Sequence, residues 1–151
     1  MFSYILYLPR MPSRRRLARV AVMQTVFEMQ MRPIEAESSL QRNIDEFGGA
    51  GQVDSPFAGK LFQGVKENWE KIRTSIESHA PEWPLERMDT ITRSILMLGA
   101  YELLFAKDAP PAVVMNEAIE VAKEYGTEES AKFVNGVLNA LAHRDDGKQV
   151  G

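Results

Sequence analysis

Apolar residues recur at steps of three and four along almost the whole chain, and this spacing constrains the fold more than any other feature. The clearest example lies between residues 54 and 79, where one apolar stripe follows the helical period over several turns: Phe57, Leu61, Val65, Trp69, Ile72 and Ile76. No segment alternates convincingly with the period of two that a half-buried β-strand requires. The sequence therefore predicts an all-α protein.

Capping residues, prolines and glycines divide this pattern into about six to seven helices. Ser13 is a candidate N-cap for the first helix, and Asp54-Ser55-Pro56 is a strong helix start. Asn135-Gly136 would suggest a hairpin turn, but the apolar spacing on both sides is helical, so we place it inside a helix. The predicted helices cover about residues 13–31, 33–47, 55–76, 91–106, 114–125 and 127–143.

Residues 80–84, with the sequence Ala-Pro-Glu-Trp-Pro, interrupt the helical pattern and form the best internal boundary. A length of 151 residues is typical of one domain with a substantial core. We therefore expect a single helical domain over residues 11–145, made of packed sub-bundles at about 12–80 and 84–143. A disordered extension at 1–10 and a disordered tail at 146–151 would flank it.

The first ten residues contain six large apolar side chains from Phe2 to Leu8, followed by Pro9. The run is too short to cross a membrane and precedes the arginines, the reverse of a signal peptide. An acid-free, arginine-rich start also fits an organelle transit peptide, which we keep as an alternative. We expect a cytoplasmic protein without membrane contact, in which Met11 is the initiator and residues 1–10 come from an upstream start assignment.

Signals for catalysis are weak. The chain has no Cys, which excludes disulfides, thiolate zinc sites and a cysteine nucleophile. His79 and His143 are the only histidines, and neither has a metal-ligand partner at motif spacing. No phosphate-binding glycine loop, nucleophile elbow or paired-carboxylate signature is present. We expect no enzymatic activity, no cofactor and no metal site.

Positive charge is concentrated at the start of the chain. Residues 1–27 contain five arginines and no acidic residue, whereas all 21 acidic side chains lie beyond Phe27; the formal net charge of −3 hides this asymmetry. Arg14, Arg15 and Arg16 stand at a helix N-terminus, where cations oppose the helix dipole. This weakens a purely structural explanation and favours contact with a polyanion. A solvated helix start is the alternative.

Arg16, Arg19 and Phe27 fall on one face of the first helix. Arginines contact phosphates, and an aromatic ring can stack on an unpaired base, a combination typical of single-stranded RNA binding. The helix is apolar nearly all round, however, so periodicity alone favours a core position for Phe27. The last helix has a second mixed face, with Lys132 exposed and Phe133 near its border, which by itself is a weak signal.

Four strings of residues stand in order along the chain: Arg14-Arg15-Arg16 and Ala18-Arg19 leading to Gln24 and Phe27, then Ile95 to Leu104, Asn116 to Lys123, and Lys132 to Leu138. Together these strings resemble the NusB family of bacterial transcription antitermination factors. The resemblance covers about residues 13–142 and implies an all-helical fold of two small packed bundles without catalysis.

The resemblance also implies partners. Family members bind the boxA segment of ribosomal RNA leader transcripts, a single-stranded RNA, jointly with NusE, a small-subunit ribosomal protein. The pair then joins other Nus factors on RNA polymerase and suppresses premature termination, and family members occur as monomers and as homodimers. By residue-to-residue correspondence, the RNA-binding residues would be Arg14, Arg15, Arg16, Arg19, Phe27, Glu129, Lys132 and Phe133.

Two positions depart from the family pattern in the region that would face NusE. Met97 stands where arginine is common, and Thr92 where an acidic residue is common. Two other interpretations remain open. The chain could be a fragment of an RNA cytosine methyltransferase, which carries a related RNA-binding domain ahead of its methyl-donor-binding domain. It could also be a helical interaction module with no nucleic-acid role.

Overall fold

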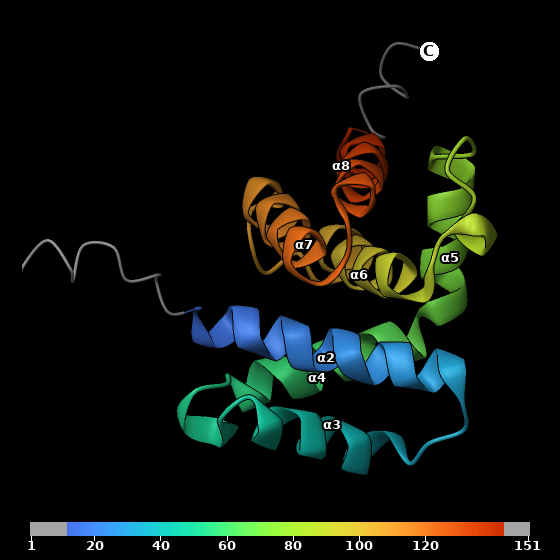
Figure 1. Cartoon of the computed structure of the whole chain (residues 1–151). Helices are drawn as coiled ribbons and strands as arrows, with labels where there is room; N and C mark the ends of the chain where they lie inside the picture. The colour runs from blue at the N-terminus through green and yellow to red at the C-terminus, as the bar shows by residue number, and fades with distance from the viewer. Residues whose placement is uncertain (1–11, 144–151) are drawn as a thin grey trace, which may run out of the picture.

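The computed structural model describes residues 12–143, which contain seven α-helices and, within that range, no β-strand (Figure 1). The predicted all-α class is confirmed. The predicted extension at 1–10 and tail at 146–151 lie outside the described residues. The helices are α2 (Arg14–Met31), α3 (Ala36–Glu46), α4 (Ser55–Glu67), α5 (Trp69–His79), α6 (Thr90–Tyr101), α7 (Pro111–Tyr125) and α8 (Glu128–Ala142).

Side-chain caps set the start of several helices where the sequence predicts them. The Ser13 hydroxyl accepts a hydrogen bond of 3.0 Å from the backbone N–H of Arg16, and the Asp54 carboxylate accepts one of 3.1 Å from Phe57. Thr127 and Ser130 form a reciprocal capping box at the start of α8. Asn135-Gly136 lies within α8, as expected.

Two of the predicted helices are interrupted in the structure. The helix that starts at residue 55 ends at Glu67, because Asn68 leaves helical geometry and its side-chain amide donates 2.8 Å to the Gly64 carbonyl. The helix predicted to reach residue 106 changes at Glu102 into a π-helix, Glu102–Ala106, which ends at Lys107 in the left-handed region (φ 53°). In the sequence, apolar residues continue through both positions, so their spacing did not reveal either interruption.

The helices pack in two groups, stacked as two layers in Figure 1. One group contains α2, α3 and α4, and the other contains α5, α6, α7 and α8. The sequence placed the boundary between sub-bundles at 80–84, but α5 packs against α6 and α8, so the change of group falls at Asn68. The proline-rich segment at 80–84 is instead a turn within the second group.

Helix α6 belongs to the second group and forms its contact with the first. It packs against α2 and α4 on one side and against α5, α7 and α8 on the other. Its side chains Leu96 and Met97 are fully buried. Gly64 on α4 allows the closest approach between the groups, since a Cβ atom at that position would overlap the ring of Tyr101. The two groups therefore form one continuous core, and α2 packs against α3 and α4 of its own group and against α6 of the other.

Candidate nucleic-acid interface

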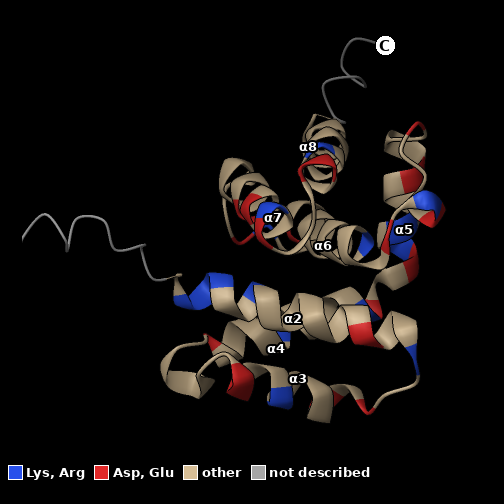
Figure 2. Ribbon diagram, in the orientation of Figure 1, with Lys and Arg blue, Asp and Glu red and all other residues tan. Residues whose placement is uncertain are grey.

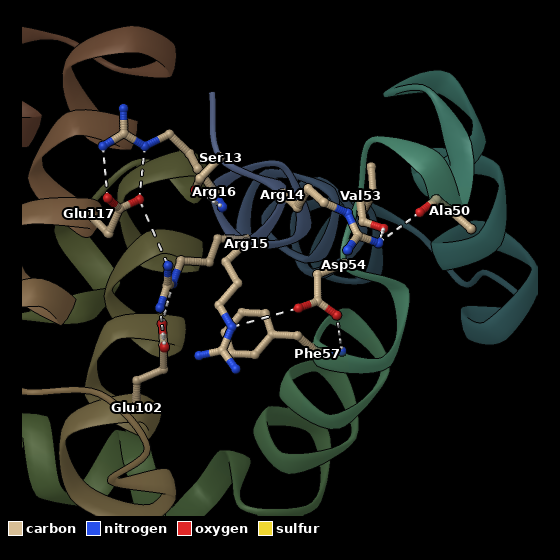
Figure 3. A network of polar contacts seen from close by, with 11 residues as sticks. Ser13, Arg14, Arg15, Arg16, Ala50, Val53, Asp54, Phe57, Glu102 and Glu117 are labelled. Carbon is tan, nitrogen blue, oxygen red and sulfur yellow. Dashed lines mark hydrogen bonds and ion pairs between the residues drawn. The ribbon is translucent and has the colours of Figure 1, made fainter. Parts of the chain in front are cut away.

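The first turns of α2 carry the densest basic cluster of the described chain (Figure 2). Each of its four arginines has protein partners on another element (Figure 3). Arg14 donates a hydrogen bond of 2.8 Å to the carbonyl oxygen of Ala50 in the loop before α4, and a longer one of 3.4 Å to that of Val53. Arg14 is nevertheless exposed, so its guanidinium contacts the loop and solvent at the same time.

Arg15 is the most open of the arginines that have a charged partner. Its guanidinium lies 4.5 Å above the ring centroid of Phe57, and its Nε is 3.7 Å from the Asp54 carboxylate. The side chain remains 51% exposed. Because stacking on a ring uses the face of a guanidinium and not its N–H edges, Phe57 fixes the plane of Arg15 while its donors stay available for a phosphate.

Arg16 forms a two-point ion pair with Glu117 of α7. Its Nε and Nη2 donate at 2.8 and 2.9 Å to the two carboxylate oxygens. This bonding lowers the pKa of Glu117 and raises the pKa of Arg16, so both groups are charged near neutral pH. The pair occupies only two of the five N–H donors, and the side chain is still 26% exposed.

Arg19 has a different environment, although we predicted that it contacts RNA. Its side chain is only 8% exposed, and its Nε and Nη2 donate at 2.9 and 2.8 Å to Glu102. Nη1 lies 3.8 Å from Glu117, and the guanidinium is 5.0 Å from the centroid of Phe57. The structure does not present Arg19 to a ligand, because one helical turn beyond Arg16 the helix has entered the interior.

The arginines connect both groups of helices. Arg14 and Arg15 hold the start of α4 and the loop before it, while Arg16 and Arg19 hold α7 and the π-helix. Sequence analysis did not identify their partners as part of the site. Glu102 and Glu117 do lie within strings that we quoted for the family resemblance, which is the only signal that could have pointed to them. The missed partners are Asp54, Phe57, Glu102 and Glu117.

Phe27 is half-buried and lies outside the buried core. Neither the core position favoured by periodicity nor full exposure describes it. Arg19 and Met23, on the same helix face, are both buried. The exposed arginines, Arg14 and Arg15, and Phe27 are therefore separate points, about 18–20 Å apart along the helix axis at 1.5 Å per residue, and not one continuous strip.

Two of the three predicted residues of α8, Glu129 and Phe133, line a second surface feature. Glu129 and Lys132 are exposed, and the ring of Phe133 meets Trp83 edge to face with centroids 5.0 Å apart. A groove of about 530 Å³, which we call the Trp83–Phe133 groove, includes Trp83, Glu129 and Phe133 in its lining. Gly136 allows Trp83 to approach α8 closely, since a Cβ there would lie 3.0 Å from the indole.

Both departures from the family pattern lie in the interior. Met97 is fully buried, and so is Thr92, whose hydroxyl donates at 2.7 Å to the Asp89 carboxylate and lies at hydrogen-bond distance, 3.0 Å, from the Ser130 hydroxyl. Thr92 therefore ties the start of α6 to the start of α8 and also forms part of the Trp83–Phe133 groove. The effect of these two residues on a partner surface is indirect, through packing.

Within residues 12–143 no three His, Cys, Asp or Glu side chains gather in a way that could hold a metal ion. No helix of that range is long and apolar enough to cross a membrane. His79 and His143 each contact a backbone carbonyl four residues earlier in the chain.

The fold and the surface together define a class of protein: a small all-α protein with two packed helical groups and an arginine-rich first helix. The NusB family model matches residues 16–143, and the chain belongs to the NusB family.

The similar proteins agree with this assignment. The chain is 44% identical over 128 residues to the transcription antitermination protein NusB of Bacillus licheniformis, covering 85% of this chain and 95% of that protein. It is 37% identical to NusB of Bacillus subtilis, covering 85% and 94%. Among solved structures, NusB of T. maritima has a TM-score of 0.73 at 40% identity, covering 85% of this chain and 89% of that one.

A crystal structure of the antitermination factors NusB and NusE in complex with double-stranded RNA is also similar. Its TM-score is 0.74 at 26% identity, and the match covers 85% of this chain and 96% of that one.

Proposed function

We propose that this protein is a transcription antitermination factor that binds boxA RNA of ribosomal RNA leader transcripts together with NusE. The complex would act in the cytoplasm, where it joins other Nus factors on RNA polymerase. The observation that carries the proposal is the display of Arg14, Arg15 and Arg16 at the start of α2, in a chain that belongs to the NusB family.

Residues of different chemistry would make different contacts with the RNA. Arg14, Arg15 and Arg16 supply guanidinium donors for backbone phosphates, which position a strand without reading its sequence. Phe27 and Phe133 offer aromatic surface to unpaired bases, and the exposed carboxylate of Glu129 can accept a hydrogen bond from a base amino group. Lys132 adds an exposed cation beside them.

The partner NusE is supported by the similar complex of NusB, NusE and double-stranded RNA. We expect NusE to form a complex with this protein at micromolar concentration and to raise its affinity for boxA RNA. Two surfaces that hold one strand raise the effective concentration of the second contact. Titration calorimetry with purified NusE, with and without RNA, measures this, and absence of a complex contradicts the proposal.

The deciding experiment measures RNA affinity as a function of salt. BoxA RNA should bind more tightly than a scrambled RNA and than the same boxA sequence in a duplex. Replacing Arg14 and Arg15 by Ala should weaken binding and make the slope of log K against log salt shallower by about 0.7 for each lost phosphate contact. Arg73→Ala on α5 is the matched control, because Arg73 is paired with Glu70 and Glu77 away from the site.

No observation favours the alternative of a methyltransferase fragment. The curated relatives named above are antitermination proteins, and the match covers 94% or more of each of those two proteins. An unchanged salt slope in the arginine variant, with full affinity, would instead favour the helical interaction module.

A further inference from the structure

A second groove, separate from the Trp83–Phe133 groove, lies between α4 and the π-helix. It has a volume of about 490 Å³, and we call it the Phe105 groove. None of its residues belongs to the binding surface predicted from the sequence. Its lining includes Phe57, Lys60, Gln63 and Glu67 on the α4 side and Tyr101 and Phe105 on the other.

The Phe105 groove begins where the arginine cluster ends. Phe57 belongs to both, since its ring carries the guanidinium of Arg15 at 4.5 Å and also lines the groove. Lys60 follows Phe57 by one helical turn and is exposed. An RNA strand with one phosphate bound to Arg15 could therefore place another phosphate near a second cation, Lys60, which lines the groove.

The opposite wall is an aromatic platform. The rings of Tyr101 and Phe105 stack with centroids 6.0 Å apart and planes within 10° of parallel. Tyr101 is held against Gly64, and Phe105 is 38% exposed, although a large apolar side chain gains by burial. Tyr101 is the last residue of α6, and Phe105 stands on the π-helix, a distortion that often marks functional positions.

The charged side chains that line the groove favour one orientation of a bound RNA strand. Glu67 lies nearly two turns beyond Lys60 on α4, and Asp108 and Glu102 also line the groove, with Glu102 already paired with Arg19. Carboxylates repel phosphates but accept hydrogen bonds from the amino groups of bases. A backbone that follows Arg15 and Lys60, with its bases directed inward, satisfies both kinds of group.

We propose that the Phe105 groove binds unpaired nucleotides that continue the RNA strand beyond the arginines, with a base stacked on Phe105 and the adjoining phosphate on Lys60. This proposal rests on the proposed function and extends its RNA footprint to α4 and the π-helix. Every base has a face that can stack, so the groove lengthens the bound segment with little sequence preference.

The test compares a boxA RNA with the same RNA extended by about four uridines at its 5′ end or its 3′ end. For the unmodified protein, one of the two extensions should raise affinity about 5- to 150-fold, the range of one stacked base. Phe105→Leu should abolish that gain, and Phe105→Trp, which keeps a stacking ring, should retain it. Lys60→Ala should make the salt slope shallower by about 0.7 for the extended RNA only.

Val113→Ala is the matched control, because Val113 is an exposed apolar residue on α7 outside the groove lining. It should leave all affinities unchanged. Phe105 and Lys60 are both exposed, so their variants should fold, which circular dichroism and thermal unfolding verify. Fluorescence anisotropy with labelled RNA gives the affinities.

The outcomes separate this proposal from the proposed function. If boxA RNA itself fails to bind, the proposed function fails and the groove proposal with it. If boxA RNA binds but neither extension adds affinity, or Phe105→Leu keeps the gain, the groove proposal is overturned and the function stands. If Phe105→Leu weakens NusE binding and leaves RNA affinity unchanged, the groove docks protein, which also overturns the proposal.

Discussion

Burial separates arginines of identical chemistry along a single helix. Arg15 lies on the surface over Phe57, and Arg19, one turn later, lies inside with both carboxylate oxygens of Glu102. A charge with an exposed edge can serve a ligand, whereas a buried charge must be paired within the protein. The same residue type therefore contributes binding at one position and stability at the next.

The burial of Arg19 leads to a stability prediction. Arg19→Ala leaves Glu102 buried without its partner, which should cost about 3–5 kcal/mol in the free energy of unfolding. Urea denaturation measures the loss. Arg73→Ala removes an exposed pair and should change stability little. Equal effects of the two substitutions would contradict the assigned role.

Phe27 can be tested for both roles with a single variant. Phe27→Ala should reduce RNA affinity by roughly 1–3 kcal/mol if the ring stacks on a base. Because the ring is half-buried, the loss in unfolding free energy should fall below the roughly 3–5 kcal/mol of a fully buried ring. Calorimetry with boxA RNA and urea denaturation on this variant give both numbers. Intact RNA affinity with a large stability loss would exclude stacking.

At the scale of helices, packing depends on where small residues stand. Gly64 on α4 lies under the ring of Tyr101 on α6, and Gly99 on α6 lies so close to α8 that an added Cβ atom would be only 3.0 Å from the side chain of Leu138. Gly59, on the same helix as Gly64, has no atom within 4 Å of an added Cβ. Two glycines of one helix therefore have opposite consequences.

This contrast predicts opposite signs for two alanine substitutions. Gly64→Ala should destabilise the protein by about 1–3 kcal/mol through overpacking against Tyr101. Gly59→Ala should stabilise it by about 0.4–1 kcal/mol, the usual gain in a helix. Thermal unfolding of both variants measures these changes. In a Tyr101→Ala background, Gly64→Ala should cost less stability than it does in the unmodified protein. A stabilising Gly64→Ala would show that the two helices do not pack as described.

In the whole molecule, ion pairs join the two groups of helices. Arg16 and Arg19 come from the first group, and Glu102 and Glu117 belong to the second. The hydrogen bond from Arg16, aided by the charges of Arg16 and Arg19, holds the pKa of Glu117 below its usual value of 4.5 despite partial burial. The connection between the groups therefore depends on a carboxylate that stays ionised.

A pH dependence of stability follows from the lowered pKa of Glu117. A carboxyl whose pKa is lower in the folded than in the unfolded state stabilises the fold above the unfolded value and loses this effect as pH falls through the folded value. The protein should lose stability as pH drops below about 4.5, and Glu117→Gln should make that loss shallower while lowering stability at pH 7. Urea denaturation at pH values from 7 down to well below 4.5 measures both effects.

Glu86→Gln, at an exposed position in the turn after residue 84, is the control and should keep the pH dependence of the unmodified protein. Identical pH profiles for Glu117→Gln and the unmodified protein would contradict the linkage.

The sequence by itself determined the all-α class, the caps at Ser13 and Asp54, and the position of the basic cluster. These features are local: a helical period, a capping oxygen and a run of arginines act within a few residues of chain. Residues that match a family motif were found by the same means, since a motif is also read along the chain.

Tertiary structure alone decided which arginine faces solvent, which carboxylate it meets and where the helical groups divide. Glu102 and Glu117 are 83 and 101 residues away from their arginine partners, so no periodicity connects them. The break at Asn68 depends on a side-chain hydrogen bond that competes with the helix, and the place of α5 depends on packing against α6 and α8. Contacts between distant segments follow from how helices pack, a property that no single stretch of sequence contains.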